Sequence, residues 1–159
     1  MPYVEPTQHL PYPATLIDMN RAFEAWVTMK VQDWANDYLP EHRLAAQPSF
    51  AWLHDINKTD RSQTIGQLVP DICLQDRQGE FTHVIDAKYK VISQIGDIAS
   101  TDWQQLFTYQ TYLQTEQAWL ILPKTADFHQ PQCVTTGKQK MWAIPFDVAQ
   151  ARLITNDMP

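Results

Sequence analysis

The chain has 159 residues, of which 44% are hydrophobic and 11% aromatic, so it is long enough to form one domain with a packed core. Its formal net charge of −6 excludes a generally basic surface, and confines any DNA contact to a local surface or to one shared with a partner. No apolar stretch approaches about 18 residues, and the N-terminus has neither a basic start nor an apolar run. We therefore expect a cytoplasmic protein without a membrane span or a secretory signal.

The N-terminal part of the chain is predicted to be an arm followed by a long helix. Residues 1–14 contain four prolines and are expected to form an extended arm. Apolar side chains then recur three or four residues apart, which predicts an amphipathic helix over residues 15–38. Lys30 interrupts the apolar stripe, and Pro40 ends the helix. The apolar positions are Leu16, Met19, Phe23, Trp26, Val27, Trp34 and Tyr38.

The hydrophobic period changes to two over residues 48–90, which predicts strands. Pro70 makes one of them irregular, because proline lacks the amide proton that strand pairing uses. Gly79 lies in a tight turn at a position that favours a positive φ, so the strands on either side form a hairpin. The expected elements are a short strand with Phe50 and Trp52, a loop Asp55–Ser62, a strand Ile65–Gln75, a turn at 76–79 and a return strand Glu80–Lys90.

The C-terminal half is predicted to contain two helices and two strands. Ser100 or Thr101 can cap a helix that runs to about Leu113, with Asp102 in the first turn, where the helix dipole favours a negative charge. The remaining elements are a buried strand Gln117–Pro123, a polar loop 124–139, a strand Lys140–Pro145 and a closing helix Phe146–Leu153. This order predicts an α/β fold with a mixed central β-sheet flanked by helices.

The cysteines and histidines have no spacing typical of a metal site. Cys73 and Cys133 match no zinc-ligand pattern and are expected to be buried free thiols in a reducing cytosol. The five histidines are scattered along the chain, so a zinc site is not expected. His83 shares a strand face with Ile85, opposite to Asp86, and is therefore expected to be structural.

One group of charged residues has a spacing that points to chemistry. Asp86 and Lys88 are two residues apart on the return strand, so their side chains project from the same face. The turn at 76–79 folds the preceding strand back, which can bring Asp71 beside Asp86. Two carboxylates that meet in this way repel each other, so the arrangement is favourable mainly when a cation is bound. Carboxylate oxygens are ligands of Mg²⁺ or Mn²⁺, and a nearby lysine can orient the attacking water of phosphodiester hydrolysis.

Each of these residues also has a purely structural interpretation. Asp71 can be a turn residue, and Asp86 and Lys88 can form an ion pair on a solvent-facing strand. Two features of the sequence favour the site. Charged residues occupy positions 86, 88 and 90 on one strand face, and the combination of a Pro-Asp kink with Asp-x-Lys on the next strand is rarer than either element alone.

These residues resemble the motif of the PD-(D/E)xK nuclease superfamily, with Pro70-Asp71 and Asp86-x-Lys88 as its core. Other short blocks are similar to the nuclease domain of the McrC family, the endonuclease subunits of the McrBC modification-dependent restriction systems. The blocks are Phe23-Glu24, Pro70-Asp71-Ile72, Asp86-Ala87-Lys88-Tyr89-Lys90 and Asp102-x-x-Gln105-x-x-x-Tyr109. The resemblance implies a restriction-endonuclease-like core, with residues 15–159 forming a single nuclease domain.

The resemblance also implies a role for each matched residue. Asp71 and Asp86 would be metal ligands, with the Ala87 carbonyl as a third, and Lys88 would be the catalytic lysine. Glu24 would complete the metal shell directly or through water. The supporting residues, which would hold the site together and contact DNA, are Gln105, Tyr109 and Lys90.

The function implied is a Mg²⁺- or Mn²⁺-dependent DNA endonuclease in restriction and defence against foreign DNA. The resemblance implies an AAA+ GTPase or ATPase subunit as the protein partner, and the sequence contains no G-x-x-x-x-G-K-[ST] loop that would supply a motor of its own. That the chain works alone or with a different partner stays open. A homodimer would supply the two active sites that cutting both strands requires. Two alternatives stay open: a repair or resolvase-type nuclease, and a non-catalytic interaction module with a nuclease fold. The acidic charge favours the module, whereas the intact set of Asp71, Asp86 and Lys88 counts against it.

Overall fold

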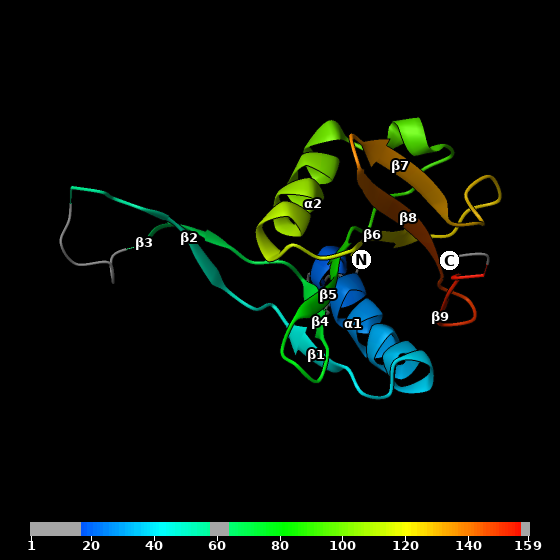
Figure 1. The fold of residues 1–159 in the computed structure, drawn as a ribbon. Helices are drawn as coiled ribbons and strands as arrows, with labels where there is room; N and C mark the ends of the chain where they lie inside the picture. The colour runs from blue at the N-terminus through cyan, green and yellow to red at the C-terminus, as the bar shows by residue number, and fades with distance from the viewer. Residues whose placement is uncertain (1–16, 58–63, 157–159) are drawn as a thin grey trace, which may run out of the picture.

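The computed structural model describes residues 17–57 and 64–156, which form a mixed central sheet with helices packed against it (Figure 1). This architecture confirms the predicted α/β fold. The arm expected at residues 1–14 lies outside the described residues. Across the part of the chain that is described, none of the helices combines the length and the apolar character needed to cross a lipid bilayer.

The sheet has seven strands in the order β1-β4-β5-β6-β8-β7, with β9 paired to β8. Strands β5, β6 and β8 run parallel to one another, whereas the other neighbours are antiparallel. The carboxyl ends of the three parallel strands therefore meet at one edge of the sheet. The strands are β1 (Arg43–Ala46), β4 (Ile72–Gln75), β5 (Phe81–Ala87), β6 (Gln117–Pro123), β7 (Gln132–Thr136), β8 (Gln139–Asp147) and β9 (Arg152–Leu153).

Helix α1 (Met19–Tyr38) confirms the first predicted helix. At its two ends, the buried residues differ from the predicted apolar stripe. The Asp18 carboxylate caps it by accepting hydrogen bonds from the amides of Asn20 and Arg21. Met19 and Tyr38, expected in the apolar stripe, are exposed. The fully buried face follows a strict four-residue spacing instead, which places its members on one side of the helix. Its members are Phe23, Val27, Val31 and Ala35.

The predicted strand Ile65–Gln75 is broken at Pro70, as its irregularity suggested. Its first part is β3 (Thr64–Leu68), which pairs with β2 (Phe50–His54) in a separate two-stranded ribbon that projects from the domain (Figure 1). Its second part is β4, which belongs to the central sheet. Strand β1, which pairs with β4, was not predicted.

The hairpin of β4 and β5 has the turn expected from Gly79, whose φ is +87°. Strand β5 ends earlier than predicted, at Ala87. The amide of Lys88 still donates to the Ile121 carbonyl of β6, but the amide of Lys90 donates back to the Lys88 carbonyl, so the backbone turns away from the sheet. Lys88 and Lys90 therefore follow the strand and do not belong to it.

Helix α2 (Ser100–Leu113) lies where the second helix was predicted, and Asp102 is in its first turn. The expected cap at Ser100 or Thr101 is wrong, because Ala99 is the N-cap residue and provides no side-chain hydrogen bond. A short 3₁₀ helix, η1 (Ile95–Asp97), precedes α2.

The predicted closing helix Phe146–Leu153 is wrong. Strand β8 continues to Asp147 because Phe146 pairs with Pro123 of β6, and the chain then turns back into β9. The loop predicted at 124–139 contains β7, an edge strand. These segments have little hydrophobic periodicity of their own, and pairing with β8 stabilises them.

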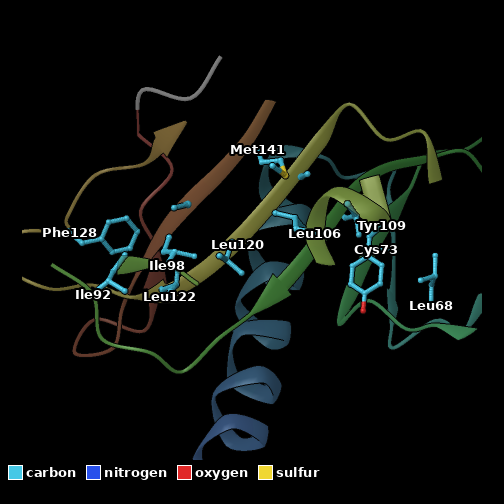
Figure 2. Close-up of a cluster of buried hydrophobic side chains, with 13 residues drawn as sticks. Leu68, Cys73, Ile92, Ile98, Leu106, Tyr109, Leu120, Leu122, Phe128 and Met141 are labelled. Carbon is cyan, nitrogen blue, oxygen red and sulfur yellow. The ribbon is translucent and has the colours of Figure 1, made fainter. Parts of the chain in front are cut away.

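Two hydrophobic clusters lie on the two faces of the sheet. One packs α2 against Cys73, Val84 and Leu120 (Figure 2). The other packs α1 against alternate strand residues such as Ile85 and Ile121. Both cysteines are free, but only Cys73 is buried, so the expectation that Cys133 is also buried is wrong. The alternation between the clusters determines which face each residue at the end of β5 occupies.

Candidate active site

Asp71, Asp86 and Lys88 gather at the carboxyl end of β5. Asp71 lies in the break between β3 and β4, and its side-chain Oδ2 accepts a hydrogen bond of 2.7 Å from the Ala87 amide. Its own carbonyl accepts a hydrogen bond from the amide of Gln47, which follows β1. The carboxylate of the Pro-Asp turn is thereby attached to the residue between Asp86 and Lys88.

Asp71 is partly buried, and this changes its acidity. Desolvation, followed by repulsion from Asp86, raises its pKa to about 7, although the hydrogen bond from Ala87 opposes the rise. Glu24 raises it further and Lys88 lowers it. Asp71 is therefore a carboxyl group that a nearby cation would convert to the charged form at neutral pH.

Asp86 is 1% exposed and projects from β5. Burial raises its pKa above the ordinary value, and the hydrogen bond and charge of Lys88 oppose that rise. The Lys88 ammonium lies 2.8 Å from Oδ2 of Asp86. This buried oxygen has no other hydrogen-bond partner among the described residues. It can therefore accept a further cationic or hydrogen-bonding group.

Lys88 connects Asp86 to α2. Its ammonium donates a 3.2 Å hydrogen bond to Gln105 Oε1 in addition to the ion pair with Asp86. Burial lowers the pKa of Lys88, but the hydrogen bond and charge of Asp86, with the charges of Asp71 and Asp102, raise it more, so the pKa lies above its ordinary value. Lys88 is thus a fully charged group at neutral pH.

Gln105 and Tyr109 form a relay between Lys88 and the Pro-Asp turn. Gln105 Nε2 donates to the Tyr109 hydroxyl at 2.8 Å, and this hydroxyl donates to the Val69 carbonyl at 3.1 Å. Val69 directly precedes Pro70 in the chain. Tyr109 is 5% exposed, so both hydrogen bonds of its hydroxyl lie within the packed domain, and the predicted contact of Tyr109 with DNA stays a prediction.

Glu24 reaches the same region from α1. Its Oε1 accepts a hydrogen bond of 2.6 Å from Gln47, the residue whose amide holds the Asp71 backbone. Gln47 was not predicted as a site residue. Its positive φ of 47° marks a special backbone position, but glutamine carries no signal for that conformation in the sequence.

Lys90 forms an ion pair of 2.6 Å with Asp102 in the first turn of α2. Asp102 is buried, whereas the Lys90 side chain is half-exposed. Asp102 was recognised as part of a motif block but was not predicted as a site residue. Its place next to Lys90 depends on how α2 packs on β5.

A cleft of about 330 Å³ joins these groups. Three of its lining residues come from helices, Asp71 directly precedes β4, and the other three lie at the end of β5 or directly after it. Its residues are Asn20, Glu24, Asp71, Ala87, Lys88, Lys90 and Asp102. With Asp86 beneath Lys88, carboxyl groups outnumber ammonium groups, which favours the binding of a cation.

Asp71 and Asp86 are the two carboxyl groups of this site that could hold a metal ion. Within residues 17–57 and 64–156, no group of three or more His, Cys, Asp or Glu side chains is placed to hold a metal ion. Mg²⁺ keeps several waters and usually binds one or two carboxylates, which Asp71 and Asp86 provide. Both are partly or fully buried carboxyl groups with raised pKa values, and a bound cation would stabilise their charged forms.

The McrBC family, described as a 5-methylcytosine restriction system component, matches residues 6–123, which is more than half of the chain. No curated protein matches the present chain. Among solved structures, the chain is similar to one in the refined half-complex from a tetradecameric assembly of Thermococcus gammatolerans McrB AAA+ hexamers with bound McrC. The TM-score is 0.60 at 16% identity, over 88% of this chain and 31% of that chain. At this identity the likeness shows the fold alone. The present chain spans under a third of the length of the similar chain. By the match over residues 6–123, the chain belongs to the family of McrBC 5-methylcytosine restriction system components.

Proposed function

We propose that this protein is a Mg²⁺- or Mn²⁺-dependent DNA endonuclease of the PD-(D/E)xK type, acting in the cytoplasm in restriction and defence against foreign DNA. The observation that carries this proposal is the 2.7 Å hydrogen bond from the Ala87 amide to Asp71. It joins the Pro-Asp turn to the Asp86-x-Lys88 segment, so that Asp71 and Lys88 line one small cleft and Asp86 lies 2.8 Å from the Lys88 ammonium.

Asp71 and Asp86 would hold the metal together with the Ala87 carbonyl, and Glu24 would complete the shell directly or through water. When bound, the metal supplies Lewis-acid polarisation of the phosphate and lowers the pKa of a bound water. Asp71, whose carboxylate stays fixed to the Ala87 amide through Oδ2, keeps its second oxygen for this role.

Lys88 would orient the attacking water and stabilise negative charge on the phosphate. Its ammonium is already positioned by Asp86 and Gln105, so little reorganisation is needed when substrate arrives. Gln105 and Tyr109 would keep this geometry by linking Lys88 to the carbonyl of Val69. Lys90, half-exposed at the cleft, would contact a backbone phosphate.

The partners that we propose are DNA and a separate AAA+ GTPase or ATPase subunit. The similar solved structure contains McrB AAA+ hexamers with bound McrC, and the present sequence has no nucleotide-binding loop. A homodimer would provide two sites for cutting both strands of a duplex.

The test is cleavage of plasmid DNA by wild-type protein and by Asp86→Asn, with Mg²⁺ or Mn²⁺, and with a cognate AAA+ subunit supplied. We expect the wild type to cleave DNA in a metal-dependent way and Asp86→Asn not to cleave it. Asp33→Asn is the matched control, since Asp33 is an exposed ion-paired aspartate on α1. Wild-type protein that neither cleaves DNA nor binds metal under any of these conditions would identify a non-catalytic interaction module.

A further inference from the structure

The ion pairs of the described residues fall into two kinds. In two of them, Lys30–Asp33 and Arg77–Glu41, the acidic side chain is 63% and 54% exposed. In the other three, a buried aspartate holds a lysine that remains partly exposed. These are Asp86–Lys88, Asp102–Lys90 and Asp147–Lys124, whose aspartate side chains are 2%, 9% and 7% exposed.

The three pairs of the second kind gather at one edge of the sheet. Lys88 directly follows β5, Lys124 directly follows β6, and Asp147 is the last residue of β8. Since these strands are parallel and neighbouring strands lie about 4.8 Å apart, their carboxyl ends form one continuous edge.

Two hydrogen bonds attach Lys124 to this edge and to the segment that carries Lys90. The Lys124 amide donates to the Phe146 carbonyl at 2.8 Å. The Thr125 hydroxyl donates to the Ile92 carbonyl at 2.9 Å, so the chain after Lys124 contacts the chain after Lys90. The position of Lys124 relative to the cleft is therefore set by backbone contacts on both sides.

We propose that Lys124, held in place by Asp147, binds a DNA backbone phosphate and extends the DNA-binding surface from the cleft across the ends of β6 and β8. This inference rests on the proposed DNA endonuclease function. Its partner is duplex DNA, recognised through phosphate charge and not through base sequence.

The geometry of the pair suits this role. The Lys124 side chain is 38% exposed while its ammonium lies 2.7 Å from Asp147, so the positive end of the pair faces solvent and the negative end faces the protein. The hydrogen bond from Lys124 is the main reason that the pKa of Asp147 lies below its ordinary value, which keeps the Asp147 carboxylate charged at neutral pH. Lysines fixed in this way give a protein of net charge −6 a local surface for a polyanion.

The test compares two double variants that leave the net charge unchanged. Lys124→Met/Asp147→Asn removes the ammonium without leaving a buried charge behind, and Lys30→Met/Asp33→Asn does the same to an exposed pair on α1. Binding to duplex DNA is measured at several salt concentrations with Ca²⁺ in place of Mg²⁺, so that the DNA stays intact.

We expect the salt dependence of binding, as log K against log salt, to become less steep by about 0.9 in the Lys124→Met/Asp147→Asn protein, which is the loss of one phosphate contact. The Lys30→Met/Asp33→Asn protein should keep the wild-type slope. Lys124→Arg should keep the wild-type slope as well, because it retains the positive charge. If Lys124→Met/Asp147→Asn does not fold, Lys124→Gln takes its place and is compared with Lys124→Arg.

A folded variant lacking the Lys124 ammonium that binds DNA with the wild-type slope overturns the inference. If the wild type cleaves DNA at the same time, the proposed endonuclease function stands and only the role of Lys124 fails. Wild-type protein that neither binds nor cleaves DNA overturns both.

Discussion

Strand β5 carries two buried titratable side chains three residues apart, and their surroundings differ completely. His83 faces α1, where its ring makes edge contacts with Trp34 and Trp119 at centroid distances of 6.0 and 5.0 Å. Burial, followed by repulsion from His42, lowers its pKa to about 4. Asp86 faces α2 and is buried at least as deeply, but the Lys88 ammonium lies 2.8 Å from it.

The difference shows what burial does to a charge with and without a partner. In aromatic surroundings the neutral form of His83 is the stable one, so this side chain packs like an uncharged ring. Beside Lys88, the carboxylate of Asp86 is opposed by desolvation and supported by an ion pair, and it therefore remains available for a stronger cation. One end of β5 is consequently structural, and the other is suited to chemistry.

The largest effect is expected from Asp86→Asn. Loss of this proposed metal ligand should lower the rate of DNA cleavage by at least about 1000-fold, because metal-ion catalysis contributes several kcal/mol. His83→Gln, on the other end of the same strand, should leave cleavage within about twofold of the wild type. Plasmid cleavage measured beside thermal melting of each variant checks both. A cleavage rate for Asp86→Asn equal to that of the wild type would remove the metal role.

The second effect concerns Lys88→Met, which should reduce cleavage by roughly 100-fold or more, the range of a group that acts on proton transfer and phosphate charge. Metal binding should survive, because the lysine is not a ligand. Removing the ammonium also removes the competitor for Asp86, so the metal affinity should not decrease. Titration with Mn²⁺ measures this directly, and loss of metal binding together with activity would argue that Lys88 organises the whole site.

The third effect is on stability without metal. The pKa of Asp71 is raised to about 7 in the folded protein, so between about pH 4 and 7 the folded state keeps a proton that the unfolded chain has released. The wild type therefore loses stability through this group as the pH rises across that window. Asp71→Asn should melt at a higher temperature than the wild type at pH 8, by a few degrees, and the two should converge near pH 4. A constant difference at every pH would contradict the raised pKa.

The smallest effect is the pH dependence of stability that His83 causes. Its sign is opposite to that of Asp71, because stability falls as the pH is lowered. Because its folded pKa is about 4, the unfolded chain binds a proton between about pH 6.5 and 4 that the folded protein does not. The stability that the folded protein gains from neutral His83 is therefore present above pH 6.5 and is lost as the pH falls. His83→Gln should lose less stability than the wild type between pH 7 and 4.5. Melting curves across this range measure it, and parallel curves for the two proteins would show that His83 is not held neutral by burial.

Much of the local structure follows from residue order alone. The three- and four-residue spacing of apolar side chains predicts α1, and Gly79 predicts the turn between β4 and β5. Both signals act within a few residues, because helix faces and turn dihedrals are properties of neighbours in the chain. For the same reason, the two-residue spacing of Asp86 and Lys88 predicts that their side chains lie together, and their ion pair follows from it.

What the chain order determined, then, is the type of fold, the central hairpin and the residue types of the candidate site. The tertiary structure alone decided which distant groups meet. Gln47 reaches Glu24 across 23 residues, and Asp102 reaches Lys90 only because α2 packs beside the end of β5. Strands β1, β7 and β9 form because β4 and β8 offer unpaired edges, and the short segments that fill them carry weak signals of their own. Pairing and packing between remote segments depend on the shape of the whole domain, which local periodicity does not encode.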